Sequence, residues 1–139
     1  MHRMVLLKHT LPDGSWHYDW LLATAGDESG RGALSLLAFR VYVEVCLPSA
    51  AAFVALRLRD HRPDYLTYEG EIEGNRGHVA RVASGRWRLD QRTDTLITGA
   101  VDWGRGARWF EASSINAHWR VRVMATDRPP QLRRRGLRS

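Results

Sequence analysis

A short turn segment, Leu11-Pro12-Asp13-Gly14-Ser15, separates His9 from the triplet His17-Tyr18-Asp19 and constrains most strongly how this chain can fold. Proline presets the backbone angle φ and glycine accepts positive φ, so Pro-Asp-Gly between two apolar segments predicts a tight turn. The flanking segments are then the two strands of a hairpin, which brings His9 opposite His17. Because side chains alternate between the two faces of a strand, His17 and Asp19 share one face.

Two imidazoles and a carboxylate that converge from rigid strands can bind a divalent metal and leave coordination positions open for a ligand. We therefore expect His9, His17 and Asp19 to form a metal site of the catalytic type. Two other interpretations remain open. The residues can be polar strand residues with local hydrogen bonds, and His17 and Asp19 with a distant histidine such as His118 also match the two-histidine, one-carboxylate triad of iron enzymes.

The rest of the chain is rich in strand patterns separated by Gly, Asp and Asn turn signals. The expected strands are residues 3–10, 16–24, 34–46, 65–73, 77–83, 86–90, 95–101, 106–112 and 117–124. Residues 27–32 indicate a flexible turn, and Ser49 to Arg59 is the one good helix candidate, because Ser49 can cap a run of alanine and leucine. We expect a mainly β fold, a small closed antiparallel β-barrel with one or two short helices, which leaves no exposed sheet edge.

Length and composition favour one compact domain over residues 1–126, since 44% of the 139 residues are hydrophobic. No apolar run approaches the ~18 residues of a membrane span, and the chain starts directly in a strand, so we expect no signal peptide and no membrane contact. The single cysteine, Cys46, excludes an intrachain disulfide and suits the cytoplasm. We expect a monomer.

The net charge is +6, and Lys8 is the only positive residue that is not arginine. Arginine suits phosphate recognition, although a coding bias would give the same charge. Residues 127–139 combine Pro129-Pro130 with an arginine cluster and have almost no core-forming side chains. They predict a disordered basic tail that contacts nucleic-acid backbone without sequence preference.

Two ordered groups of motifs carry a resemblance to a known family. The first is Lys8-His9 followed by His17-Tyr18-Asp19. The second is H-x-x-x-Y-x-x-Y-E-G over residues 61–70, followed by G-x-x-G-x-V over 74–79 and G-x-W over 85–87. The ordered pair resembles the 3′-phosphoesterase domain of bacterial DNA ligase D, a multifunctional end-joining ligase. The match covers about residues 5–90, and the chain looks like a divergent, stand-alone member.

The resemblance implies a small β-barrel that uses manganese to remove 3′-terminal ribonucleosides and 3′-phosphates from DNA ends. The residues that it implies are His9, His17 and Asp19 for the metal, His61 and Tyr65 for catalysis at the phosphate, and Lys8 and Arg76 for substrate binding. A hairpin turn flanked by glycines explains Asn75-Arg76 equally well. DNA 3′ ends would be the partner, with a separate DNA ligase or polymerase as a further candidate.

Two departures from the family pattern bear on activity. The family has an arginine two residues after the aspartate, where this chain has Leu21, and another eight residues before the later histidine, where it has Phe53. Leu21 shares the strand face of Asp19, so the first change removes a bidentate phosphate donor from the pocket. We expect weak activity, improved by Leu21→Arg if the neighbouring core tolerates the charge. The alternative is a DNA-end-binding barrel that has lost catalytic turnover.

Overall fold

The computed structural model describes residues 1–24 and 35–130, and its fold is mainly β. The elements are β1 (His2–Thr10), β2 (Trp16–Ala23), β3 (Leu36–Val41), β4 (Ala52–His61), the 3-10 helix η1 (Pro63–Leu66), β5 (Gly70–Glu71), β6 (His78–Arg92), β7 (Leu96–Asp102), β8 (Arg108–Ile115) and β9 (His118–Val123). The predicted turn at 27–32 and most of the predicted tail lie outside the described residues. Within these residues, no helix has the length and apolar character needed to cross a bilayer.

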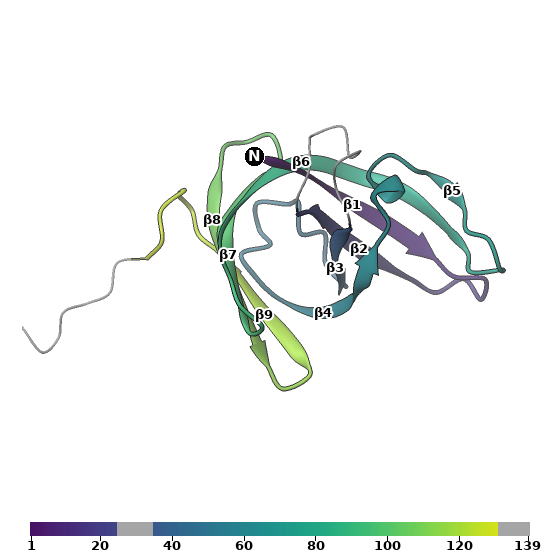
Figure 1. Cartoon of the computed structure of the whole chain (residues 1–139). Coiled ribbons are helices and arrows are strands. Elements are labelled where there is room, and N and C mark those ends of the chain that lie inside the picture. Colours follow the sequence, from purple (N-terminus) through teal and green to yellow (C-terminus); the bar gives the residue numbers. More distant parts are fainter. Residues whose placement is uncertain (25–34, 131–139) are drawn as a thin grey trace, which may run out of the picture.

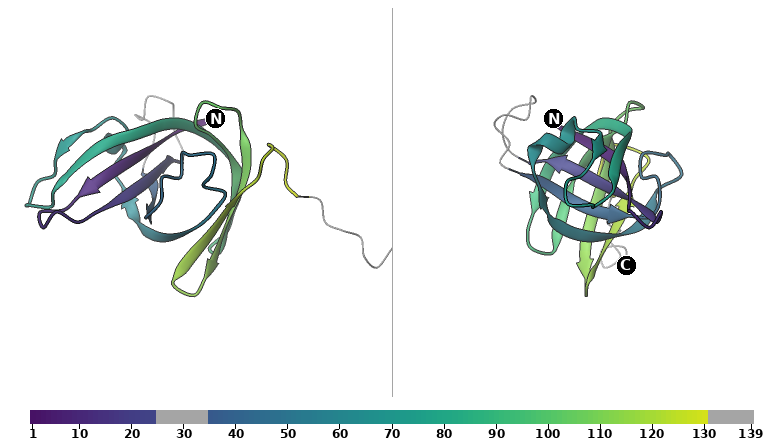
Figure 2. Two further views of the ribbon diagram at one scale, coloured as in Figure 1. Left: turned by 180° about the vertical axis from the view of Figure 1, so that it is seen from behind. Right: turned by 90° about the vertical axis from the view of Figure 1, so that its right-hand side faces the viewer.

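Eight antiparallel strands form a ring, which Figure 1 shows from one side. The order around the ring is β1-β2-β3-β4-β9-β8-β7-β6, and β6 pairs again with β1. Strand β5 pairs with β6 beside the ring. Figure 2 shows the same arrangement from behind and from the right-hand side of Figure 1. The expected mainly β, antiparallel fold is confirmed, and the ring gives each of its strands a partner on both sides.

The larger hydrophobic core lies inside the ring, because all eight ring strands contribute side chains to it. Its bulkiest fully buried members are Trp20, Trp87, Phe110 and Met4. Strand alternation explains why these residues face inward, since Met4 and Leu6 on β1 belong to this core while the residues between and after them do not. The ring core therefore supplies most of the apolar burial that stabilises the strands.

A second, smaller core lies on the opposite face of β1, β2 and β3. Val5 and Leu7 alternate with the inward residues of β1 and pack here with Leu21 of β2, Ala38 of β3 and Leu66 of η1. Helix η1 thus covers the outer face of the strands that begin the ring. This contact fixes the chain segment after β4 over the hairpin that carries the predicted metal ligands.

The predicted helix at Ser49 to Arg59 is wrong, because the segment from Ala52 to His61 is strand β4. Alanine and leucine favour a helix in isolation, but tertiary pairing overrides that preference. Strand β4 bonds to β3 on one side and β9 on the other. Phe53 faces the ring core and Val54 faces outward, which is the two-residue period of a strand.

Four other expected strands have different bounds. The expected strand at 65–73 is replaced by the end of η1 and the two residues of β5. The expected strands at 77–83 and 86–90 are one continuous strand, β6, whose pairing with β1 shifts at a bulge between Leu6 and Leu7. The expected strand at 34–46 is shorter, since β3 ends at Val41 and turns follow.

The ring core contains one buried hydrogen bond that makes a testable prediction. Trp87 is fully buried, and its indole Nε1 donates to the carbonyl oxygen of Ala23 at 2.8 Å. We expect Trp87→Phe to lower the free energy of unfolding by about 1–3 kcal/mol, because it leaves that buried carbonyl without a donor. Trp16→Phe, at an exposed position, is the control and should change it by less than about 0.5 kcal/mol. Urea denaturation measures both, and equal effects would contradict the prediction.

Candidate active site

The β1–β2 hairpin has the predicted register, with His9 opposite His17. Gly14 adopts φ of 89°, and the amide of Gly14 donates to the carbonyl of Leu11 at 2.9 Å. The Asp13 carboxylate accepts from the amide and the hydroxyl of Ser15 at 2.9 and 2.6 Å, and these hydrogen bonds lower the pKa of Asp13. The turn chemistry of the sequence therefore sets the register that places the histidines together.

The predicted convergence of His9, His17 and Asp19 is confirmed. One ligand atom from each side chain lies within 4.8 Å of the others. His17 and Asp19 are only 3% and 4% exposed, and His9 is half-buried at the edge. His118, the example of a distant histidine in the iron-enzyme alternative, is exposed on β9 and does not belong to this group.

The hydrogen bond of His9 determines which of its ring nitrogens faces Asp19. His9 Nε2 lies 2.8 Å from the carbonyl oxygen of Arg76, which can only accept, so Nε2 carries a hydrogen. In neutral His9, the Nδ1 lone pair then faces Asp19 Oδ2 at 3.5 Å. His17 Nε2 and Asp19 Oδ1 lie 3.1 Å apart, and both are buried without a hydrogen bond among the described residues.

A cation between these atoms would stabilise the buried carboxylate. A divalent ion fits the donor set, because an ion bound at about 2.1 Å holds its ligand atoms roughly 3–4 Å apart. The bond from His9 Nε2 to a backbone carbonyl is the usual support that orients a metal-binding imidazole. These three residues therefore fit a divalent metal.

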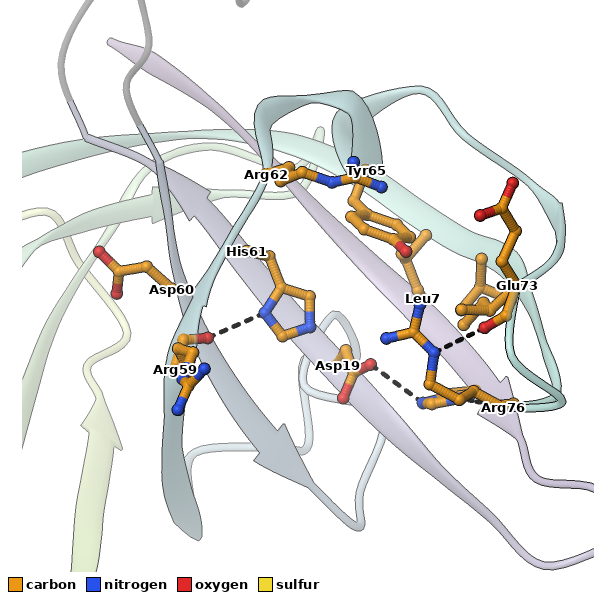
Figure 3. Close-up of a pocket in the computed structure, with 12 residues that line it drawn as sticks. Leu7, Asp19, Arg59, Asp60, His61, Arg62, Tyr65, Glu73 and Arg76 are labelled. Atoms are coloured by element: carbon orange, nitrogen blue, oxygen red, sulfur yellow. Dashed lines mark hydrogen bonds and ion pairs between the residues drawn. The ribbon is translucent and has the colours of Figure 1, made fainter.

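A cavity of about 430 Å³ opens over the predicted metal ligands, and Figure 3 shows the side chains around it. Its floor is Leu7, His9 and Asp19 from the hairpin. One wall comes from the end of β4 and from η1, and the other from the turn between β5 and β6. The smaller core holds η1 in place over β1 and β2, so the segment after β4 becomes a wall of the cavity.

His61 and Tyr65 both line this cavity, as the family resemblance implies. Their rings lie 5.7 Å apart at 69°. His61 Nδ1 donates to the carbonyl oxygen of Arg59 at 3.0 Å, so in neutral His61 the lone pair is on Nε2. This nitrogen can accept a proton, and the Tyr65 hydroxyl can donate one hydrogen bond.

Arg76 and Lys8, the two residues implied for substrate binding, occupy different places. Arg76 lines the cavity, and its Nε donates to the carbonyl of Glu73 at 2.7 Å. The structure does not bring Lys8 to the cavity. The side chain of Lys8 lies on the face of β1 opposite to that of His9, and its Nζ lies 4.6 Å from the centre of the Trp16 ring. Strand alternation explains the separation, since neighbouring residues face opposite ways.

The turn that carries Arg76 docks closely on the hairpin. Gly77 has φ of 89°, and a Cβ at this position would overlap the carbonyl oxygen of Thr10. Asn75 is also in the left-handed region, and the amide of Ile72 donates to the carbonyl of Gly77 at 2.8 Å. The G-x-x-G motif is thus a tight turn, and its close approach places the Arg76 carbonyl against His9.

Leu21 and Phe53, which replace two arginines of the family pattern, are both core residues. Leu21 is fully buried in the smaller core beneath η1. Phe53 packs in the ring core, with its ring 6.0 Å from that of Trp20. Apolar contacts therefore occupy both positions.

The sequence did not identify Arg59 and Arg62, which flank His61 and line the cavity. Neither forms an ion pair with a described residue. Asp60 also borders the cavity, but it is committed to Arg57 at 2.6 Å and Ser35 at 2.9 Å. Burial raises the pKa of Asp60, and the hydrogen bonds from Arg57 and Ser35 outweigh this and lower it. Arg59 and His61 are two residues apart on β4 and therefore share a face. Predicting β4 as a strand would have identified Arg59.

Besides Arg59 and Arg62, a third arginine lies next to the predicted metal ligands. Arg40 on β3 is directly opposite Asp19 in the register, and its Nε is buried without a hydrogen bond among the described residues. By contrast, Glu69 of the Y-E-G motif pairs with Arg81 at 3.0 Å, and hydrogen bonds from the Arg81 amide and guanidinium lower the pKa of Glu69. Glu69 is therefore a structural carboxylate.

Neither known protein families nor curated proteins offer a match for this chain. The resemblance to the ligase D phosphoesterase domain thus rests on the motifs of the sequence.

The grouping of His9, His17 and Asp19 predicts binding of a divalent metal, for which Mn²⁺ is a suitable probe. Asp19→Asn should abolish Mn²⁺ binding in calorimetric titration, because it removes the only carboxylate of the group. The parent should also gain about 2.7 kcal/mol of stability at a metal concentration of 100 Kd, whereas the variant should gain none. Asp94→Asn, at an exposed carboxylate in the β6–β7 turn, should bind as the parent does. Equal binding by both variants would rule out this site.

The burial of Leu21 predicts how an arginine at this position, as in the family pattern, would change stability. Leu21→Arg should lower the free energy of unfolding by about 3 kcal/mol or more, because it places an unpaired charge in an apolar core. Leu21→Met keeps the volume and should cost less than about 1.5 kcal/mol. Denaturation curves measure both. A Leu21→Arg protein as stable as the parent would show that this position reaches the cavity after all.

Proposed function

We propose that this protein is a metal-dependent 3′-phosphoesterase that trims DNA ends, removing a 3′-phosphate or a 3′-terminal ribonucleotide during repair. The observation that carries the proposal is the convergence of His9, His17 and Asp19 on one point beneath a cavity that also contains His61 and Tyr65. A closed barrel of the phosphoesterase type, manganese as the metal, and a separate ligase or polymerase as partner belong to the same proposal.

The side chains divide the chemistry between them. A bound divalent ion would neutralise charge on phosphate oxygens and lower the pKa of a water nucleophile. His61 holds a lone pair on Nε2 in its neutral form and donates from the same atom when protonated, so it serves as the acid or base at the phosphate. Tyr65 contributes a hydroxyl donor within the same cavity.

Arginines from a different segment offset the two that are missing. Arg59, Arg62 and Arg76 line the cavity around His61, and the first two have no ion-pair partner among the described residues. Guanidinium groups bind phosphate oxygens in a bidentate manner. We therefore assign phosphate binding to these three residues, in place of the positions that Leu21 and Phe53 occupy.

A non-catalytic DNA-end binder is the second candidate. The core positions of Leu21 and Phe53 favour it, because the family pattern has charged donors there. Such a binder would use the same arginines and contact DNA chiefly through phosphates, so its affinity would fall steeply with salt. It would not release product.

The decisive experiment incubates the purified protein with a primer-template that ends in a 3′-phosphate or a 3′-ribonucleotide, with and without Mn²⁺. We expect weak, Mn²⁺-dependent trimming that His17→Ala or His61→Ala abolishes. Substituting Arg59 and Arg62 together by alanine should lower the rate by about 10²-fold or more, since one preorganised charged donor is typically worth 10²–10³.

Arg120→Ala is the matched control, because Arg120 is an exposed arginine on β9 outside the cavity. It should trim at the parental rate. If a sensitive assay finds no trimming while salt-dependent DNA binding persists, the binding function replaces the catalytic one.

A further inference from the structure

A second cavity, of about 260 Å³, adjoins the candidate active site. The residues that line both cavities are Arg62, Tyr65, Ile72, Glu73 and Arg76. The residues that line only the second are Asp64, Tyr68 and Glu71. Figure 3 shows the shared wall, with Arg62 and Tyr65 on one side and Glu73 and Arg76 on the other. The mechanism above gives this second cavity no role.

The two cavities differ in charge. Besides the shared residues, the first contains Arg59 and the carboxylates of Asp19 and Asp60, of which Asp60 is paired with Arg57. The second adds the carboxylates of Asp64 and Glu71 to that of Glu73. A DNA strand whose phosphates are bound in the first cavity would meet like charge in the second. The second cavity is therefore suited to an uncharged part of the substrate.

Tyr68 gives this cavity an aromatic wall. Its ring meets that of Tyr65 edge-on at 5.9 Å and 87°, and its hydroxyl donates to the carbonyl oxygen of Glu71. These two contacts hold the ring in place, yet the residue is 40% exposed. An exposed, fixed aromatic ring can stack on a nucleic-acid base of any sequence.

The carboxylates match the remaining groups of a nucleoside. Ionised carboxylates only accept hydrogen bonds, and the hydroxyls of a sugar donate them. Neither Asp64 nor Glu73 has a side-chain partner among the residues that the structure describes. A ribose offers one more hydroxyl than a deoxyribose, and this 2′-hydroxyl is how proteins tell RNA from DNA.

We infer that the second cavity binds the 3′-terminal ribonucleoside, the leaving group of the phosphodiester reaction. The inference rests on the proposed function. Water attacks the phosphorus, and the bond between phosphorus and the nucleoside O5′ breaks. The electron pair stays on O5′, which takes a proton, and the strand keeps a 3′-phosphate that contains the oxygen of the water. Tyr68 and the nearby carboxylates are then residues that determine specificity.

A binding experiment without turnover tests the inference. Two primer-templates carry the fluorescent base 2-aminopurine, one in the terminal ribonucleotide and one three nucleotides inward, and both bind in EDTA. We expect strong quenching only for the terminal base, because only that base reaches Tyr68. Tyr68→Ala should lose the quenching and Tyr68→Phe should keep it. Tyr42→Ala, which removes a tyrosine that is 62% exposed outside both cavities, is the control and should behave as the parent.

Kinetics provide the second measurement. Tyr68→Ala should raise the KM for a ribonucleotide-ended primer about tenfold, since stacking on one aromatic ring is worth about that factor or more. The KM for a 3′-phosphate primer should not change, because that substrate has no nucleoside beyond the phosphorus. The Tyr68→Phe protein separates loss of the ring from loss of the hydrogen bond to Glu71.

The outcomes separate the two proposals. If neither the parent nor any variant trims DNA, but the parent still quenches the terminal base selectively, the proposed phosphoesterase function is wrong and nucleoside binding in the second cavity is supported. If trimming depends on Mn²⁺ but terminal and internal bases are quenched equally in the parent, the nucleoside cavity is overturned. This comparison uses the parent alone, so it decides even if Tyr68→Ala does not fold.

Discussion

The rest of this site depends on the carboxylate of Asp19, which is buried between the imidazoles of His9 and His17. Removing a carboxylate from water costs several kcal/mol unless an opposite charge compensates it. The nearest nitrogens are His17 Nε2 at 3.1 Å and His9 Nδ1 at 3.5 Å, and the hydrogen of neutral His9 is on the other nitrogen, Nε2, which donates to the Arg76 carbonyl. The fold holds this unfavourable arrangement because two cores support the hairpin from both faces. A cation at this point turns the cost into binding energy.

The smaller core explains how the site differs from the family pattern that it resembles. Leu21 contributes apolar contact under η1 at a position where the pattern has a charged donor. That contact holds η1 and the end of β4 against the hairpin, and the same segment carries Arg59 and Arg62 into the cavity. One packing arrangement thus accounts for the buried leucine at position 21 and for the two arginines in the cavity.

Local chemistry made the hairpin and its ligands predictable, and tertiary context hid the rest. Pro12 and Gly14 specify a turn by themselves, so the facing of His9 and His17 followed from the sequence. Strand β4 did not, because its alanines and leucines favour a helix until β3 and β9 supply hydrogen-bond partners. Because this segment was predicted as a helix, the sequence did not indicate that Arg59 and His61 share one face of a strand. The separation of Lys8 from the cavity was accessible from alternation alone, but the family motif places Lys8 and His9 together.

The hydrogen bond from His9 to the Arg76 carbonyl would couple the proposed metal binding at His9 to the proposed phosphate binding at Arg76. Arg76 lines the cavity where phosphate binding is proposed, and its backbone carbonyl accepts the hydrogen bond of His9, a proposed metal ligand. An anion that fixes this turn also fixes His9, so it lowers the entropy that metal binding must remove. By thermodynamic linkage, the factor by which the anion tightens the metal equals the factor by which the metal tightens the anion. If the site binds a metal and a phosphate as proposed, it would bind either one alone more weakly than both together.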